Sequence, residues 1–189
     1  MSRPRGRPPK SEDPATRDRL LEAATAECVD VGFDTVTLAA VAARAGVTPA
    51  AVYNHFADKE ELLYTAGRVA IGRLAERFAP AVARGRGAHE VAAAFLDPSF
   101  GPSRRLILEL HLAGTRHPQL AAHLADWHRE FATPATADRP PAAEQLATIK
   151  ALFLLLLGLC HLEDLAELAV PPESLAARVE RLVDALFAN

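Results

Sequence analysis

The strongest constraint on the fold is a pair of helix signals around one glycine, within the segment 37–63, TLAAVAARAGVTPAAVYNHFADKEELL. Thr37 precedes an apolar run with helical spacing, so its hydroxyl can cap a helix over about 38–45. Gly46 should end that helix, because a residue without a Cβ adopts the left-handed conformation at little cost. The segment therefore predicts a short helix followed by a tight turn.

Two further helix starts follow this turn. Thr48 is a favoured N-cap and Pro49 suits the first helical position, which predicts a helix over about 49–55. Asp58 and Glu61 form an Asp-x-x-Glu capping box, which indicates another helix N-terminus. Two short helices joined around a glycine are typical of the helix-turn-helix, whose second helix lies in the major groove of DNA.

The same residues resemble the N-terminal domain of the TetR family of bacterial transcriptional repressors over about 14–64. The motif positions that carry the resemblance are Gly32, Thr37, Val41-Ala42, Ala45-Gly46-Val47-Thr48, Val52-Tyr53, His55-Phe56 and Lys59-Glu60-x-Leu62. The resemblance implies phosphate contacts from Thr37, Tyr53, His55 and Lys59. It implies that the side chains facing base edges are Thr48, Pro49, Ala50 and Asn54.

This chain departs from the family pattern at several of these positions. Ala39 and Ala40 stand where family members often have charged phosphate contacts, and Ala50-Ala51 replaces a common Gly-Thr pair. Recognition is therefore expected to depend more on methyl contacts to thymine and on an N-terminal arm.

The N-terminal arm is basic and rich in proline. Residues 3–10, RPRGRPPK, carry positive charges and no acid, so residues 1–12 should be disordered on their own. The Arg-Gly-Arg-Pro core resembles an AT-hook, in which Arg5 and Arg7 would enter an A·T-rich minor groove. The alternative is a solvated tail that adds only sequence-independent affinity for phosphate.

Composition favours a regulator over a general nucleic-acid binder. The net charge is −3 over 189 residues, so the basic character is local. Cys28 and Cys160 fall in apolar helical patterns and are expected to be buried thiols in a reducing cytoplasm, without a disulfide. We expect a cytoplasmic protein, because the N-terminus does not have the pattern of a signal peptide and no run is long and apolar enough to span a membrane. The apolar stretch closest to a span, 147–162, is interrupted by polar residues. No metal-ligand spacing is found.

The periodicity predicts an all-α protein with a helix-turn-helix DNA-binding domain over 13–57 and a helical ligand-binding and dimerisation domain over 58–189. The first helix, about 14–31, should bury Leu20, Leu21, Ala24, Cys28 and Val31. A linking helix over 58–80 should join the domains. The ranges 84–87, 97–102 and 133–141 are expected to be connections, with helices over about 88–96, from Ser103 to about 115, and from Pro118.

The last two helices, about 142–168 and 172–188, should form an antiparallel pair around Pro171-Pro172. The first is apolar on nearly all sides over 152–159, which indicates a partner surface or the central helix of a small bundle. The resemblance implies a homodimer built as a four-helix bundle. Two recognition helices would then meet successive major grooves of a pseudo-palindromic operator, ~34–36 Å apart.

The helices between these ends are where an effector cavity is expected. The candidate ligand-binding residues are Phe95, Phe100, Ile107, Leu110, His111, Trp127, Phe131, Phe153, Leu157 and His161. Most of these fit ordinary core packing equally well, and His111 and His161 stand out because a polar ring on an apolar stripe needs a partner. His123 and His128 lie beside charged residues and suggest a solvated face. Glu109 and Glu163 could pair with arginine or with a ligand.

Three classes of function remain. The first is a repressor released from its operator by a small, largely apolar effector, with no cofactor and no membrane partner. The second, an enzyme, is disfavoured because no nucleophile with its base, carboxylate pair or metal set survives comparison with ordinary packing. The third is a constitutive architectural DNA-binding protein whose C-terminal domain only dimerises.

Overall fold

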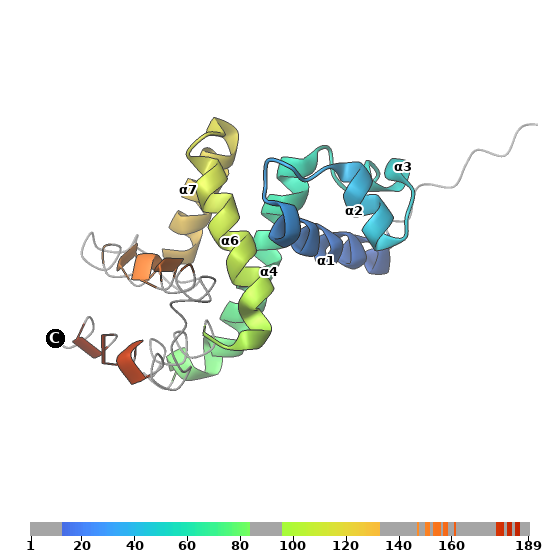
Figure 1. Cartoon of the computed structure of the whole chain (residues 1–189). Helices are drawn as coiled ribbons and strands as arrows, with labels where there is room; N and C mark the ends of the chain where they lie inside the picture. Colours follow the sequence, from blue (N-terminus) through green and yellow to red (C-terminus); the bar gives the residue numbers. More distant parts are fainter. Residues whose placement is uncertain are drawn as a thin grey trace, which may run out of the picture.

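The computed structural model describes residues 13–83 and 96–132, and runs of one to three positions within 147–161 and 177–185. For 74–75, 77–83 and 131–132 only the backbone is described. Every element in this part of the chain is helical, as predicted (Figure 1). The elements are α1 (Pro14–Val31), α2 (Leu38–Ala45), α3 (Pro49–Val52), α4 (Lys59–Ala83), the short 3₁₀ helix η1 (Pro98–Phe100), α6 (Gly101–Gly114) and α7 (Pro118–Ala132).

Local capping determines both ends of α2, as the sequence predicts. The Thr37 hydroxyl accepts the N–H of Ala40 at 3.1 Å. Gly46 adopts φ 67° and ψ 35°, and the following Val47 N–H donates to the Ala42 carbonyl at 3.0 Å. These bonds satisfy backbone groups that the helix itself leaves unpaired, so the turn between α2 and α3 is stable as a local unit.

The helix that follows is shorter than predicted. The α-helix ends at Val52, whereas the sequence indicates about 55. The N–H groups of Asn54 and His55 donate to carbonyls three residues earlier, so this part of the chain is a tight turn. The tighter winding brings Phe56 into the core, where it is 2 % exposed.

The core of residues 13–63 joins all four helices that meet there. Leu20, Ala24, Val41, Val52 and Leu62 are fully buried. Burial of an apolar side chain of this size stabilises a fold by about 1.5–3 kcal/mol, so these contacts dominate the stability of the domain.

Two of the predictions for α1 can be compared directly. The helix has the predicted bounds, and the Asp13 carboxylate caps it by accepting the Ala15 N–H at 3.1 Å. Val31 was expected to be buried and is 42 % exposed, because the helix ends there and Gly32 turns the chain away at φ 78°. Cys28 is a buried free thiol, as expected, and burial is the main cause that raises its pKa to about 12.

α4 connects the helices α1–α3 to the rest of the molecule. Asp58 accepts the N–H of Glu61 at 2.8 Å, and the Glu61 carboxylate accepts the N–H of Ala57 at 2.6 Å. The capping pair therefore forms as predicted. The helix continues to Ala83, one turn beyond Pro80, where it was expected to end. Figure 1 shows α4 running from the helices α1–α3 along α6.

α6 and α7 form an antiparallel pair against α4. α6 begins at Gly101 and not at Ser103, because η1 precedes it directly and Asp97 caps that turn by accepting the Ser99 N–H at 2.8 Å. α7 begins at Pro118, as predicted. Their fully buried side chains are Leu106, Ile107, Leu110, Ala113 and Leu120.

Several sequence-based predictions lie outside the described residues. They are the basic arm 1–12, the connections 84–87 and 133–141, most of the helix 88–96, the bounds of the helices 142–168 and 172–188, and the side chains of Cys160 and Glu163. Among the helices that are described, none is long and apolar enough to cross a membrane. The same residues contain no cluster of three or more side chains suited to a metal ion.

Candidate DNA-binding surface and ligand cavity

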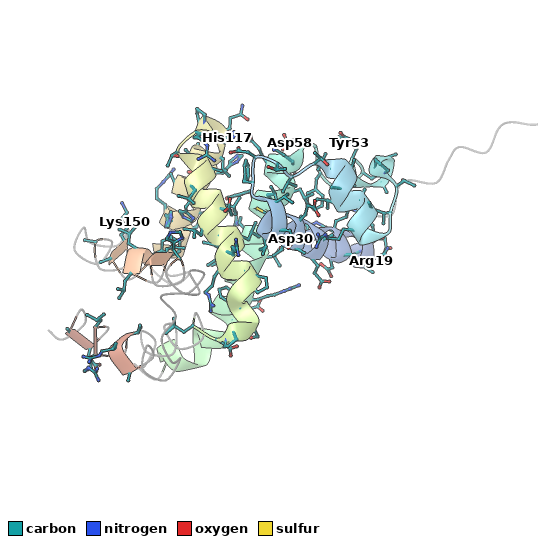
Figure 2. All side chains as sticks on the ribbon, in the orientation of Figure 1. Arg19, Asp30, Tyr53, Asp58, His117 and Lys150 are labelled. Carbon is teal, nitrogen blue, oxygen red and sulfur yellow. The ribbon has the colours of Figure 1, made fainter. Side chains whose placement is uncertain are left out.

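The residues predicted to face base edges lie together on the outside of the molecule. Thr48, Pro49, Ala50 and Asn54 are exposed at the start of α3 and in the turn after it. Tyr53 is 62 % exposed in that turn. Figure 2 shows Tyr53 on the far side of the molecule from Lys150. This arrangement leaves the N-terminus of α3 open to a DNA groove.

Thr48 and Thr37 have matching structural roles. The Thr48 hydroxyl accepts the Ala51 N–H at 3.2 Å, as the Thr37 hydroxyl does for Ala40 at 3.1 Å. A capping hydroxyl uses an oxygen lone pair and keeps its own O–H as a donor. Both threonines are exposed, so each can still donate to a base or a phosphate.

Lys59 has a structural role that the sequence did not indicate. Its ammonium donates to the carbonyls of Phe33, Asp34 and Val36 at 3.2, 2.9 and 3.4 Å. It also lies 5.3 Å from the centre of the Phe33 ring. The lysine therefore holds the loop between α1 and α2, and a phosphate would have to share the ammonium with these carbonyls.

The remaining predicted DNA contacts differ in how accessible they are. His55 is half-buried, and its Nδ1 is buried without a hydrogen-bond partner among the described atoms. A contact of this ring with a phosphate would therefore use Nε2. Arg5 and Arg7 lie outside the described residues.

A polar junction connects the DNA-binding helices to the corner between α6 and α7. Asp34, in the loop after α1, accepts from Arg116 at 2.7 Å and pairs with His117 Nε2 at 3.0 Å. The second ring nitrogen of His117 lies 3.3 Å from Glu60 on α4. The bond to His117 is the main cause that lowers the pKa of Asp34. These partners are 82 and 83 positions apart, so no local pattern in the sequence pairs them.

α6 itself adds a second connection to this loop. Glu109 accepts the backbone N–H of Phe33 at 3.3 Å. The glutamate thus pairs with the protein backbone, an option that the sequence did not suggest. The close packing of α6 on α4 at Gly67, where a Cβ would lie 2.5 Å from Leu110 Cδ1, gives α6 little room to move independently.

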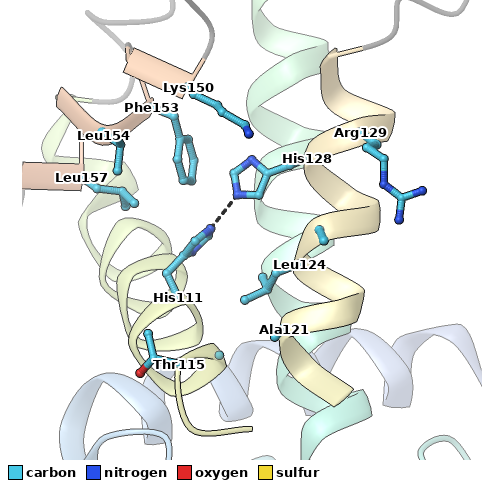
Figure 3. Close-up of a pocket in the computed structure, with 12 residues that line it drawn as sticks. His111, Thr115, Ala121, Leu124, His128, Arg129, Lys150, Phe153, Leu154 and Leu157 are labelled. Carbon is cyan, nitrogen blue, oxygen red and sulfur yellow. Dashed lines mark hydrogen bonds between the residues drawn. The ribbon is translucent and has the colours of Figure 1, made fainter. Parts of the chain in front are cut away.

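A cavity of about 730 Å³ lies between α6, α7 and the segment around residue 153 (Figure 3). Its size is within the range of small-molecule sites. Most of its wall is apolar, and the polar lining groups are few. The lining residues are His111, Gly114, Thr115, Ala121, Leu124, Ala125, His128, Arg129, Lys150, Phe153, Leu154 and Leu157.

Two histidines from different helices meet inside this cavity. His111 Nδ1 lies 2.7 Å from the Ile107 carbonyl, and its Nε2 lies 2.9 Å from His128 Nε2. A carbonyl only accepts, so Nδ1 of His111 carries a proton and its Nε2 accepts the N–H of His128. Burial is the main cause that lowers the pKa of both rings, which favours this neutral pair.

The structure separates the predicted ligand-binding residues into groups. Those that line the cavity are His111, Phe153 and Leu157. Ile107, Leu110 and Trp127 are buried in the core, Phe100 is half-buried near the start of α6, and His161 is exposed. Phe95 and the side chain of Phe131 lie outside the described residues.

The prediction that His128 belongs to a solvated face was wrong. Its ring packs inward against Phe153, with centroids 4.9 Å apart, and bonds to His111. His123, one turn earlier, is exposed as predicted. The charged neighbours of His128 misled the prediction, because charge beside a residue in the sequence does not determine the direction of its side chain on a helix.

Two short helices joined at Gly46, with the start of the second one exposed, have the arrangement of a helix-turn-helix DNA-binding domain. The model of the family "Bacterial regulatory proteins, tetR family" matches residues 20–65. The transcriptional regulator UidR of Escherichia coli K12 is 29% identical over 146 residues, which cover 74% of this chain and 72% of UidR. The helix-turn-helix segment therefore matches the tetR family, and most of the chain is similar to a bacterial transcriptional regulator.

Solved structures show the same fold over nearly the whole chain. Salmonella enterica GusR has a TM-score of 0.68 at 17% identity, over 95% of this chain and 98% of GusR. NalD of Pseudomonas aeruginosa has a TM-score of 0.56 at 20% identity, over 92% of this chain and 95% of NalD. The relatives and the fold are those of transcriptional regulators and not of enzymes.

Proposed function

We propose that the protein is a dimeric repressor of the bacterial cytoplasm, which leaves a pseudo-palindromic operator when a small, largely apolar ligand enters the cavity. The observation that carries this proposal is that one helix, α6, borders both the cavity and the DNA-binding domain. His111 of α6 lines the cavity, and Glu109 of the same helix bonds to Phe33 at the end of α1.

Movement of α6 has a short path to the recognition helix. The loop that Glu109 and His117 hold, residues 33–36, directly precedes the Thr37 cap of α2. A ligand that displaces α6, together with α4 on which it packs closely, would therefore change the position of α2 and α3. Such a ligand releases DNA only if it binds the DNA-incompetent arrangement more tightly than the competent one.

Dimerisation through the helices 142–168 and 172–188 is the second part of the proposal. Within the described positions of these segments, Leu154 is 69 % exposed and Leu182 is 47 % exposed. Large apolar side chains on a surface are typical of a partner interface, and TetR-family regulators usually dimerise. A two-fold dimer would present two copies of α3 about 34–36 Å apart.

The functions stated for similar proteins support repression. NalD is described as the secondary repressor of the MexAB-OprM multidrug efflux pump of Pseudomonas aeruginosa. FadR of Bacillus halodurans, with a TM-score of 0.65 at 14% identity, is described as a regulator of fatty acid degradation. These names belong to those proteins, and they give examples of control by a protein of this fold.

The test is selection of bound DNA from a random-sequence duplex pool with the purified full-length protein, followed by sequencing. An enriched palindrome with half-sites about one helical turn apart would support a dimeric sequence-specific regulator. That palindrome then serves as the probe for ligands that release the protein. Binding without enrichment that disappears as salt rises would contradict the proposal and favour the architectural alternative.

A further inference from the structure

The chemistry of the cavity wall identifies the class of ligand. This inference rests on the proposed function, because it concerns the effector of the same cavity. We propose that the ligand is an amphipathic organic monoanion, an apolar body with one carboxylate, whose carboxylate pairs with Lys150 and whose body lies between α6 and α7.

The charges around the cavity are of one sign. The titratable side chains that line it are His111, His128, Arg129 and Lys150, and the described lining contains no aspartate or glutamate. The other lining side chains are apolar except for Thr115. A cationic ligand would thus find repulsion and no counter-charge, whereas an anion would find a partner.

Arg129 is not the group available to such an anion. Its guanidinium forms an ion pair with Asp126 on the same helix. Figure 3 shows Arg129 on the outer side of α7, directed away from His111. The positive charge of Arg129 is therefore already balanced by a neighbouring carboxylate.

Lys150 differs from Arg129 in both respects. No ion pair of Lys150 occurs among the described residues, whereas Arg129 pairs with Asp126. Figure 3 shows Lys150 extending toward the His128 ring, beside Phe153. Lys150 is exposed, so its ammonium lies at the open side of the cavity while the walls behind it are apolar.

The hydrogen bonds of the histidine pair explain why the ligand's carboxylate would bind Lys150 and not the histidine rings. In the neutral pair, His128 donates its Nε2 proton to His111, so Nδ1 of His128 is an acceptor. The pair therefore offers no N–H donor of its own to a ligand anion. The donors for the carboxylate are the N–H groups of Lys150, whereas the rings form part of the wall against its body.

A single ammonium suits a single negative charge. A phosphate or sulfate ester would leave most of its oxygens without donors. Besides the titratable side chains, Thr115 is the one polar side chain in the described lining of the cavity. A carboxylate needs fewer donors and can keep water at its exposed oxygen. An apolar body is required because the remaining wall is built from residues such as Leu124, Phe153 and Leu157.

The test uses probes that share one skeleton, namely decanoate, decan-1-ol and decylammonium. Trp127 reports binding, because it is the one tryptophan of the chain and its ring lies 6.0 Å from that of His111. We expect decanoate to bind about tenfold more tightly than the alcohol, which corresponds to one charge-assisted bond, and the ammonium compound to bind most weakly.

Variants then assign the preference to Lys150. Lys150→Met should bring decanoate to the affinity of the alcohol and leave alcohol binding unchanged. Lys150→Glu should reverse the preference toward decylammonium. The matched control is Arg105→Met, which removes an exposed positive charge of α6 outside the cavity and should keep the preference.

The inference is overturned if the alcohol binds wild-type protein as tightly as decanoate, if Lys150→Met keeps the preference, or if no probe changes Trp127 fluorescence. Failure of the proposed function gives a different result, since the fluorescence titration contains no DNA. Lys150-dependent binding of decanoate that leaves operator affinity unchanged would contradict ligand-controlled release and support the assignment of the ligand class.

Discussion

The DNA-binding surface and the ligand cavity differ in the distance along the chain over which their side chains find partners. The caps beside the recognition helix join residues three positions apart, as Thr37 and Thr48 do with Ala40 and Ala51. In the cavity His111 pairs with His128, 17 positions away, and the junction pairs Asp34 with His117, 83 positions away. The comparison shows that the ends of the helices in a helix-turn-helix follow from signals in neighbouring residues. A ligand cavity, in contrast, is formed by side chains that only the tertiary fold brings together.

The largest expected effect comes from the residue at which the two regions meet. Phe33 is 1 % exposed, its ring contacts that of His117 at 5.2 Å, and its N–H bonds to Glu109. Phe33→Ala should lower the free energy of unfolding by about 3–5 kcal/mol, as for other buried phenylalanines. Urea unfolding followed by Trp127 fluorescence and by far-ultraviolet circular dichroism measures the change.

Phe56→Ala is the matched control for this variant. Phe56 is equally buried at 2 % exposure, and its ring contacts are within the DNA-binding domain, with His55 and Arg17. We expect Phe33→Ala to lower the Trp127 midpoint more than Phe56→Ala does, because Trp127 belongs to the cavity domain. An equal effect of both substitutions on Trp127 would contradict a special role of Phe33 in joining the domains.

Substitutions of Lys59 test whether this one side chain both stabilises the loop between α1 and α2 and contacts a DNA phosphate. Lys59→Met removes the donor to the carbonyls of Phe33, Asp34 and Val36. The expected loss in unfolding free energy is about 1.5–3 kcal/mol, as for bonds to a charged donor. The family resemblance predicts in addition that the salt dependence of DNA binding falls by about one unit of slope.

Lys59→Arg separates these two roles. Arginine keeps the positive charge for a phosphate, but its planar guanidinium does not match the site of a compact ammonium. We expect this variant to lose stability and to keep the salt dependence of the wild type. Unchanged stability in both variants would show that the loop does not depend on Lys59.

Thr48 distinguishes reading of a base from simple capping. Thr48→Ala should weaken binding to the cognate site by about 1–3 kcal/mol if its hydroxyl reads a base. Thr48→Ser keeps the hydroxyl that accepts the Ala51 N–H and should retain most of the affinity. Competition binding of the selected operator against random DNA measures both.

The control for Thr48 is Thr37→Ala, because Thr37 caps the preceding helix in the same way. Each alanine variant loses a cap worth about 1 kcal/mol of stability, so capping alone predicts similar effects. Thr48→Ala is expected to lower the affinity for the selected operator and to leave the affinity for random DNA unchanged. An equal loss on random DNA would mean that Thr48 only positions the backbone.

The sequence predicted the elements whose ends depend on neighbouring residues. α1 and α2 have the expected bounds, since Asp13, Thr37 and the glycines at 32 and 46 act within a turn of the chain. The end of α3 was missed because it depends on the burial of Phe56. Helix bounds therefore follow from local signals wherever the core does not compete with them.

The contents of the cavity were predicted less completely. Periodicity identifies a stripe of apolar residues but does not separate core from cavity wall, so Ile107 and Leu110 were grouped with Phe153. His128 was misjudged because its inward direction depends on a partner helix and not on Asp126 and Arg129 beside it. The roles of Arg5 and Arg7 in DNA binding stay predictions.

The smallest expected effect is the pH dependence of the cavity domain. Burial lowers the pKa of His111 and His128 below the ordinary value of 6.5, so the fold favours the neutral form of both rings. The unfolded chain then binds more protons below about pH 6.5, and the free energy of unfolding should decrease as the pH falls through that value.

His128→Gln should reduce this pH dependence of the unfolding free energy, because it removes one of the two rings. His123→Gln, an exposed histidine of the same helix, should leave it unchanged. Equal pH profiles of both variants, measured by urea unfolding at a series of pH values, would show that the buried pair does not control acid stability.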